Sequence, residues 1–338
     1  MKKLNANENF YGCSPKVLDA IQHCNQTLWQ YPTHPQQLEN ALATIHNVLP
    51  EQIIIGSGSV RLIDAIIQSC VEPQEEVVIF ENSFIAYEQI CEAHRRSYHK
   101  ATQRNFVCHP DAIFPLLNNK TKVVFISNPN NPTGTIISHE QLENLLKNIP
   151  SHLLVVADEA YVEYVTDDHF PRSLSLMKSY PNLIVLRTFS KVYGLAGLRI
   201  GYAIADLTVA KQLKKFRIPF FLNTYAETAA LAALQDQSFI QNSIRLNQEE
   251  RIFLHHTLQQ IGLNPVPSQT NFIYIPFEDE DKKNALHLSL QNQGILVANM
   301  LIFGQKNSLR ITIPNHETVL EICQIIHSVY SSQTNSNN

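Results

Sequence analysis

The sequence has 338 residues, of which 44% are hydrophobic and 17% charged, and its formal net charge at pH 7 is −4. This composition is typical of a globular protein with one large domain or two ordinary ones. Acidic and basic side chains are interspersed without a basic tract, which disfavours nucleic acid or an anionic membrane as a partner. No apolar run approaches the length that spans a bilayer, and the N-terminal MKKLNANENF lacks the apolar centre of a signal peptide.

Cysteines and histidines do not form a recognisable metal site. The six cysteines are scattered and never form a CxxC motif, and the fourteen histidines include no HExxH. His255 and His256 are neighbours on an expected helix and therefore point in different directions. We predict no metal, no disulfide framework and a reducing, cytoplasmic setting.

Apolar, β-branched runs alternate with polar turns and amphipathic stretches through the first two thirds of the chain. Such runs are typical of strands buried on both faces, and the stretches between them are typical of helices. The expected strands are 52–59, 76–83, 122–134, 153–161, 182–191 and 199–205, and helices are expected at 60–70 and 138–149. This order predicts a doubly wound, mainly parallel α/β sheet, in which ligands bind at the carboxyl ends of the strands.

The pattern changes after Asp206. Helices are expected at 224–234 and 240–262, the second long enough to bridge two domains, followed by strands at 271–277, 294–300 and 308–314 and helices at 281–292 and 316–330. The predicted organisation is an N-terminal arm (1–25), a large α/β domain (26–238), a smaller α+β domain (239–330) and a disordered polar tail (331–338).

Two polar turns follow expected strands. GSGS at 56–59 opens a helix, whose free N–H groups and positive dipole end can hold a phosphate, although an ordinary strand-to-helix turn also explains it. SNPNNPTG at 127–134 offers Asn amides to a ligand, or forms a turn whose Asn side chains bond their own backbone.

Charged residues follow two further strands. Asp158 ends the apolar run LLVVADEAY and requires a cationic partner, unless it caps the next helix. In RTFSKVYGLAGLRIGY (187–202), Ser190 and Arg199 can bind a phosphate, and Lys191 is either a nucleophile or a solvated surface charge. Together these groups fit pyridoxal phosphate, with its phosphate at the helix terminus, its ring nitrogen at Asp158 and its aldehyde at Lys191.

The ordered motifs SNPNNPTG, ADEAY and SKVYGLAGLRIGY resemble the fold-type I aminotransferases. LNANENFYG (4–12), QYP (30–32) and LRIT (309–312) are similar to the histidinol-phosphate aminotransferase branch, and the resemblance runs from residue 4 to about 314. It implies pyridoxal-phosphate-dependent transamination of histidinol phosphate with 2-oxoglutarate, by a ping-pong mechanism in histidine biosynthesis.

The resemblance also implies roles for individual residues. Lys191 would hold the cofactor and act as the catalytic base. The other expected cofactor contacts are Asp158 at the ring nitrogen, Asn131 and Tyr161 at the 3-oxygen, Phe84 on the ring, and Ser59, Val60, Ser190 and Arg199 at the phosphate. Tyr31 would reach the phosphate of the neighbouring subunit, which implies a homodimer. Arg310 would bind the substrate carboxylate, with Tyr11 and Asn131 as further substrate contacts.

Two departures from the family pattern bear on the substrate. Ala298 stands where relatives usually carry an arginine that helps to bind the substrate phosphate, so a charge-assisted pair of roughly 1.5–3 kcal/mol is lost. Val60 and Arg61 stand where relatives tend to carry acidic residues, and Arg61 either compensates for Ala298 or faces solvent. An aromatic amino acid is therefore the second candidate donor. The sequence is also compatible with a phosphothreonine decarboxylase-like enzyme or with a non-catalytic binding module.

Overall fold

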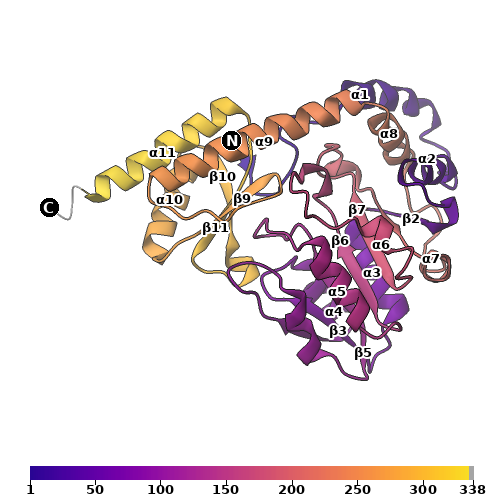
Figure 1. The fold of residues 1–338 in the computed structure, drawn as a ribbon. Helices are drawn as coiled ribbons and strands as arrows, with labels where there is room; N and C mark the ends of the chain where they lie inside the picture. Colours follow the sequence, from indigo (N-terminus) through magenta and orange to yellow (C-terminus); the bar gives the residue numbers. More distant parts are fainter. Residues whose placement is uncertain (335–338) are drawn as a thin grey trace.

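The computed structural model describes residues 1–334. Figure 1 shows two bodies, one around a large sheet and one around a small sheet, with helix α9 running along both. Within the described chain, the seven strands of the large sheet follow the order β2-β8-β7-β6-β5-β3-β4. They are β2 (Ile53–Gly56), β3 (Glu76–Phe80), β4 (Ser97–Ala101), β5 (Thr121–Ser127), β6 (Leu154–Asp158), β7 (Leu183–Thr188) and β8 (Gly201–Ile204).

The large sheet is mainly parallel, as expected. Neighbouring strands from β4 to β7 run parallel, whereas β8 runs antiparallel to both β7 and β2. All six strands expected in this part of the sequence are present. Strand β4 was not expected, because its sequence SYHKA is polar and its side chains are mostly exposed at the sheet edge.

Successive side chains of each buried strand point to opposite faces of the large sheet, and both faces are packed with apolar residues. In β5, Val123 and Phe125 join the apolar cluster of α3, while Val124 and Ile126 join the cluster of α5 on the opposite face. Because both faces are covered, the polar groups of this layer collect at the strand ends. Its helices are α2 (Gln36–His46), α3 (Ser59–Cys70), α4 (Ala86–Ala93), α5 (His139–Asn148), α6 (Ser173–Leu176), α7 (Leu207–Lys214) and α8 (Thr224–Leu234).

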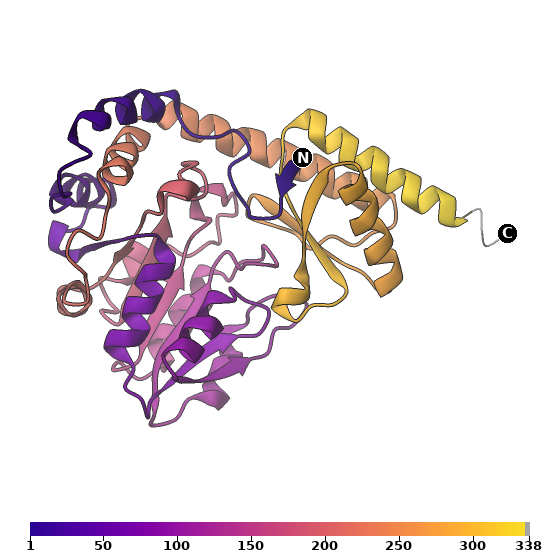
Figure 2. The same ribbon diagram turned by 180° about the vertical axis from the view of Figure 1, so that it is seen from behind.

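The small sheet joins the two ends of the chain. Its described strands are β1 (Lys2–Leu4), β10 (Ile295–Asn299), β11 (Ser308–Thr312) and β9 (Phe272–Pro276), in that order across the sheet. Strand β1 was not expected, because three residues give no periodic signal, and it pairs in parallel with β10. From β1 the chain crosses to helix α1 (Pro15–Gln22), which contacts α8 (Figure 2).

Two long helices flank the small sheet. Helix α9 (Gln237–Gln260) contacts β9 and α11 on one side and the short 3-10 helix η4 (Val162–Tyr164) on the other. Helices α10 (Glu280–Asn292) and α11 (His316–Thr334) complete this layer. Because α11 continues to Thr334, the first part of the expected disordered tail is helical, and residues 335–338 lie outside the described chain. Ser and Gln are tolerated in helices, so the polar composition of 331–334 did not end α11.

The remaining regular elements are short 3-10 helices. They are η1 (His23–Thr27), η2 (Pro50–Gln52), η3 (Pro110–Leu116), η5 (Ala196–Leu198) and η6 (Met300–Phe303). None of the helices described within residues 1–334 is long and apolar enough to cross a bilayer.

A close backbone contact fixes the N-terminal segment against the loop that follows Lys191. Gly194 has a φ of +70°, and a Cβ placed there would lie 1.9 Å from the carbonyl oxygen of Gly12. The atoms that it would meet are all backbone, so they cannot rotate away.

We expect Gly194→Ala to destabilise the protein by on the order of 3 kcal/mol, combining left-handed strain with steric overlap. Gly262→Ala is the matched control, because Gly262 also has a positive φ of +86° but nothing lies within 4 Å of its added Cβ. That variant should lose only about 1 kcal/mol. Urea unfolding of both variants measures the difference, and equal losses would contradict the contact.

Candidate active site

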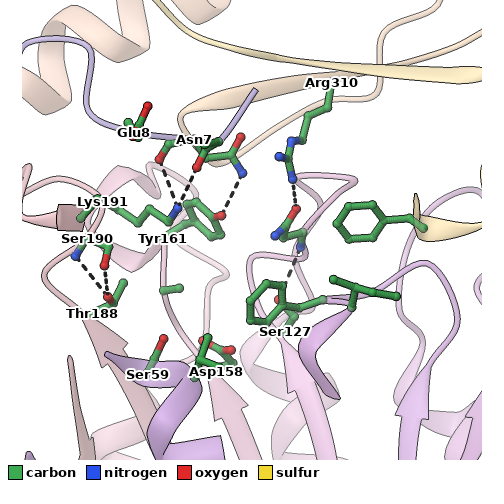
Figure 3. Close-up of a pocket in the computed structure, with 18 of the residues that line it drawn as sticks. Asn7, Glu8, Ser59, Ser127, Asp158, Tyr161, Thr188, Ser190, Lys191 and Arg310 are labelled. Carbon is green, nitrogen blue, oxygen red and sulfur yellow. Dashed lines mark hydrogen bonds between the residues drawn. The ribbon is translucent and has the colours of Figure 1, made fainter. Parts of the chain in front are cut away.

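A cavity of about 370 Å³ lies where the carboxyl ends of three parallel strands meet the start of α3. The last residues of β5, β6 and β7, namely Ser127, Asp158 and Thr188, all line it. Its size is that of a small-molecule site, and its place at the strand ends is where ligands bind in α/β sheets. Figure 3 shows Asp158 and Ser59 on the side of the large sheet, and Asn7 and Arg310 on the opposite side.

Asp158 is the buried acid of this cavity. Its side chain is 2% exposed, and its Oδ2 accepts a hydrogen bond of 2.8 Å from the hydroxyl of Tyr87. Its Oδ1 is buried and makes no hydrogen bond of regular geometry. Burial raises the pKa of Asp158 to about 6, against the lowering effect of the Tyr87 hydroxyl and the Ala160 backbone N–H. Because Asp158 lines the cavity, its buried acceptor oxygen favours a ligand that brings a donor.

The start of α3 forms an anion cradle. Gly58 precedes the helix with a φ of +85°, and a Cβ there would lie 2.7 Å from a guanidinium nitrogen of Arg199. Arg199 Nη1 lies 3.5 Å from Ser190 Oγ, which also accepts a hydrogen bond of 3.0 Å from Thr188 Oγ1. Ser59, Ser190 and Arg199 therefore surround the free N–H groups at the helix terminus, an arrangement that suits a phosphate.

Lys191 extends into the cavity beneath the N-terminal segment. Its Nζ donates to the backbone carbonyls of Ala6 and Asn7, at 3.3 and 3.2 Å, and lies 5.3 Å from the ring centroid of Tyr161 (Figure 3). A solvated surface charge therefore does not describe the position of Lys191. Lys191 lines the same cavity as the buried carboxylate of Asp158.

Arg310 is a buried cation on the opposite side of the cavity. It is 6% exposed, and its guanidinium carbon lies 5.2 Å from the ring centroid of Phe272 and 5.9 Å from that of Phe303. Nη2 donates to the carbonyl of Asn5 at 2.9 Å, Nη1 donates to Asn131 Oδ1, and Nε is buried without a partner. Because a buried guanidinium with an unpaired N–H is costly, this position favours an anionic ligand group.

The structure shows where the two departures from the family pattern, at Ala298 and Arg61, lie relative to the cavity. Ala298 lies directly opposite Arg310 in the antiparallel pair β10–β11, so the two side chains share one face of the small sheet. Arg61 forms an ion pair with Asp64 and lies outside the residues that line the cavity. Arg61 therefore does not replace the missing cation at position 298.

Ten of the predicted site residues line this one cavity. They are Ser59, Val60, Phe84, Asn131, Asp158, Tyr161, Ser190, Lys191, Arg199 and Arg310. The two others, Tyr11 and Tyr31, are not among the lining residues. Burial, together with the nearby Glu250 and Glu249, raises the pKa of Tyr11 to about 12, and Tyr31 is 78% exposed. Their contacts with substrate and with a neighbouring subunit stay predictions.

Several lining residues were missed from the sequence. Ala6, Asn7 and Glu8 belong to a motif that served only for the resemblance, and Ile302 and Phe303 come from the short helix η6. Tyr87, which bonds Asp158 without lining the cavity, packs from α4 into an apolar cluster and gives no local signal in the sequence. No three His, Cys, Asp or Glu side chains gather as a metal site in the part of the chain that the structure describes.

Comparisons with known proteins agree with this geometry. Residues 1–326 match the family described as aminotransferase class I and II. A histidinol-phosphate aminotransferase of Moorella thermoacetica is 36% identical over 92% of this chain and 81% of its own length. One from Anaeromyxobacter sp. is 39% identical, over 92% and 86%. A crystal structure of the Sinorhizobium meliloti enzyme in complex with pyridoxal-5′-phosphate superposes with a TM-score of 0.91 at 28% identity, covering 98% of this chain and 91% of that one.

These matches define the class: the chain has the fold of the pyridoxal-phosphate-dependent aminotransferases of fold type I. It belongs to the aminotransferase class I and II family, whose cofactor is pyridoxal phosphate.

The residues of the cavity fit this cofactor. The unpartnered Oδ1 of Asp158 can accept a pyridinium N–H, and the α3 terminus with Ser190 and Arg199 can hold the phosphate. Lys191 can supply the amine for the aldehyde, because among the described residues its Nζ hydrogen-bonds only to two backbone carbonyls. Each of these roles was predicted from the sequence. They stay proposals, and the support for them is that the residues line one cavity.

The buried Asp158 makes the cofactor-free protein sensitive to pH. Its folded pKa of about 6 exceeds the ordinary value near 4, so the folded state favours the protonated acid, and stability falls as pH rises from about 4 through 6. Between pH 5 and 8 we expect a loss on the order of 1 kcal/mol from this group, absent in Asp158→Asn. Glu163, whose pKa burial raises to about 7, contributes equally in both proteins. Urea unfolding of cofactor-free samples at both pH values measures this, and equal pH dependence would contradict it.

Proposed function

We propose that this chain transfers the amino group of histidinol phosphate to 2-oxoglutarate, as a step of histidine biosynthesis. The observation that carries the chemistry is the unpartnered, buried Oδ1 of Asp158 in one cavity with Lys191 and Arg199. The choice of donor is supported by relatives of that name at 36% and 39% identity over most of the chain. A cytoplasmic location is part of the proposal, because six scattered cysteines suit a reducing compartment.

The proposed mechanism assigns a task to each residue. Pyridoxal phosphate, when bound, supplies an electron sink for the electron pair of the substrate Cα–H bond. Asp158 keeps a proton at the ring nitrogen by presenting a carboxylate that has no water to solvate it. Lys191 Nζ takes the Cα proton as general base, which requires it to be neutral at that moment. Asn131 and Tyr161 donate to the 3-oxygen, and Phe84 covers the ring.

Arg310 is the proposed anchor for the anionic end of the substrate. Its Nε is buried without a partner and its planar guanidinium is held by Phe272 and Phe303, so it is oriented before the substrate arrives. In histidinol phosphate that anion is the phosphate, and in 2-oxoglutarate it is a carboxylate. One site can therefore bind both substrates in turn, as two half-reactions require.

An aromatic amino acid is the second candidate donor, and position 298 supports it. Ala298 leaves Arg310 without a second cation at its side, and the neighbouring lining residues Ile302 and Phe303 are apolar. Such a site holds one carboxylate and an aromatic side chain without an unpaired charge. Only the preference between donors separates the two candidates.

The donor test compares kcat/KM for histidinol phosphate, phenylalanine and tyrosine with 2-oxoglutarate as acceptor. We expect at least tenfold preference for histidinol phosphate, because a doubly charged phosphate is attracted to the buried Arg310 more strongly than the singly charged carboxylate of phenylalanine or tyrosine. A wide preference for phenylalanine or tyrosine would contradict the proposed donor and leave the aminotransferase chemistry intact.

Lys191→Ala tests the chemistry itself. Turnover and the visible absorption of the bound cofactor should both be lost, because no other amine is offered to the aldehyde by the described lining residues. The exposed Lys178, outside this cavity, provides the control Lys178→Ala, which should keep both. Full turnover by Lys191→Ala would refute the mechanism.

We further propose a homodimer, with Tyr31 reaching the cofactor phosphate of the neighbouring subunit. The support is an exposed apolar surface formed by two segments, in which Trp29 is 82%, Tyr31 78% and Phe220 58% exposed. The rings of Tyr31 and Phe220 stack with centroids 4.4 Å apart. Large apolar side chains this exposed are typical of an interaction surface. In a symmetric dimer, Tyr31 would contact the cofactor site of the neighbouring subunit, because it does not line the cavity of its own chain.

Phe220→Asp is expected to shift the protein from dimer to monomer, because it places a charge in the apolar surface. Sedimentation velocity measures the shift. Leu288→Asp is the control, because Leu288 is 56% exposed but belongs to α10, far along the chain from Tyr31 and Phe220. A Phe220→Asp protein that sediments as the wild type does would contradict this interface.

A further inference from the structure

Asn7 lies at the junction of the three parts that enclose the cavity. Its backbone N–H donates to Thr312 Oγ1 of β11 at 3.0 Å, which ties it to the small sheet. Its carbonyl accepts hydrogen bonds from Lys191 Nζ at 3.2 Å and from Asn271 Nδ2 at 3.1 Å. The residue is 1% exposed, so this position is fixed from several sides (Figure 3).

The backbone of Asn7 explains why an asparagine can occupy this turn. Its φ is +56°, in the left-handed region that Asn and Gly adopt more readily than other residues. Gly would satisfy the backbone equally well. The turn therefore does not require the amide side chain of Asn7.

The side-chain amide of Asn7 instead makes a contact with Tyr161. Asn7 Nδ2 donates a hydrogen bond of 3.0 Å to the hydroxyl oxygen of Tyr161, and Asn7 Oδ1 accepts from Thr312 Oγ1 at 3.4 Å. The Thr312 contact orients the amide, so the group facing Tyr161 is the NH₂, which can only donate. The hydroxyl of Tyr161 must then accept at this contact, and its own proton is free to point elsewhere. Within the described chain, the hydroxyl of Tyr161 donates to no protein group.

We propose that Asn7 is a positioning residue that holds the Tyr161 hydroxyl as an acceptor, so that its proton is directed at the cofactor 3-oxygen. The inference rests on the proposed function, which assigns Tyr161 to that oxygen. A phenol that already accepts a hydrogen bond is a stronger donor, because the two bonds polarise each other. Asn7 thereby acts on the cofactor through Tyr161.

The readout is the pH midpoint of the visible absorption band of the bound cofactor. A donor to the 3-oxygen stabilises its anionic form, so loss of that donor makes the cofactor hold its proton more tightly and raises the midpoint. Tyr161→Phe should therefore raise the midpoint. Asn7→Gly keeps the left-handed backbone and removes the amide, and should raise it on the order of half a pH unit. Asn7→Asp has nearly the same shape but cannot donate, and should raise it at least as much.

A double-mutant cycle separates positioning through Tyr161 from a general structural effect. In the Tyr161→Phe background, Asn7→Gly should cause no further rise, because the hydroxyl through which Asn7 acts is absent. Asn5→Ala is the matched control in the same segment, because Asn5 is exposed and contributes its backbone carbonyl to Arg310. It should leave the midpoint unchanged.

Each outcome identifies what has failed. An unchanged midpoint in Asn7→Gly, or a further rise of equal size in the Tyr161→Phe background, would overturn the role of Asn7 while leaving the proposed function in place. An unchanged midpoint in Tyr161→Phe would overturn the assignment of Tyr161 and the inference with it. A wild-type protein without a visible band in added pyridoxal phosphate would refute the proposed function itself.

Discussion

The site depends on one buried carboxylate. Asp158 ends β6, is 2% exposed and leaves one oxygen without a regular hydrogen bond, so its charge is costly until a cation or donor meets it. The sheet makes this possible by burying β6 between two other parallel strands, which excludes water from its carboxyl end. Tyr87 supplies one hydrogen bond and thereby orients the carboxylate. The ionised acid is destabilised when the cavity is empty, and a pyridinium N–H is a donor that would stabilise it.

The opposite wall of the cavity is formed where the two ends of the chain meet. Asn7 and Arg310 are 303 positions apart in sequence, yet Asn7 bonds Thr312 and Arg310 bonds the carbonyl of Asn5. Strand β1 makes this possible by pairing with β10, which aligns the first residues beside β11. Closing a loop of this length has a large entropic cost, and the pairing of the small sheet offsets it. The two walls of the cavity thus come from the two sheets, and Tyr161 and Phe272 pack together across them in one apolar cluster.

The sequence was most informative where local chemistry is unusual for its place. Apolar runs predicted every strand of the large sheet except β4, whose polar side chains lie at an exposed edge. Asp158, Lys191 and Arg199 were predicted as site residues. A charged side chain at the end of a buried apolar strand is costly unless a partner or ligand pairs with it. Tyr87 and Asn7 were not assigned roles, because a tyrosine in a helix and an asparagine in a turn are ordinary locally. Only tertiary contacts with Asp158 and Tyr161 distinguish them. The proposed role of Tyr31 would depend on a second chain, so the contacts within one chain do not test it.

The alanine at position 298 can be understood from the cost of burying like charges. Arg310 is 6% exposed, and a second arginine directly opposite it on β10 would place two guanidinium groups side by side whenever the substrate is absent. A methyl group removes that repulsion and lets Ala298 join the apolar cluster of Tyr274 and Met300. If Arg310 binds the substrate anion as proposed, a phosphate dianion would meet one buried cation instead of two. Ala298 would then stabilise the empty cavity at the cost of part of the electrostatic binding of a doubly charged donor, while a singly charged carboxylate would lose nothing.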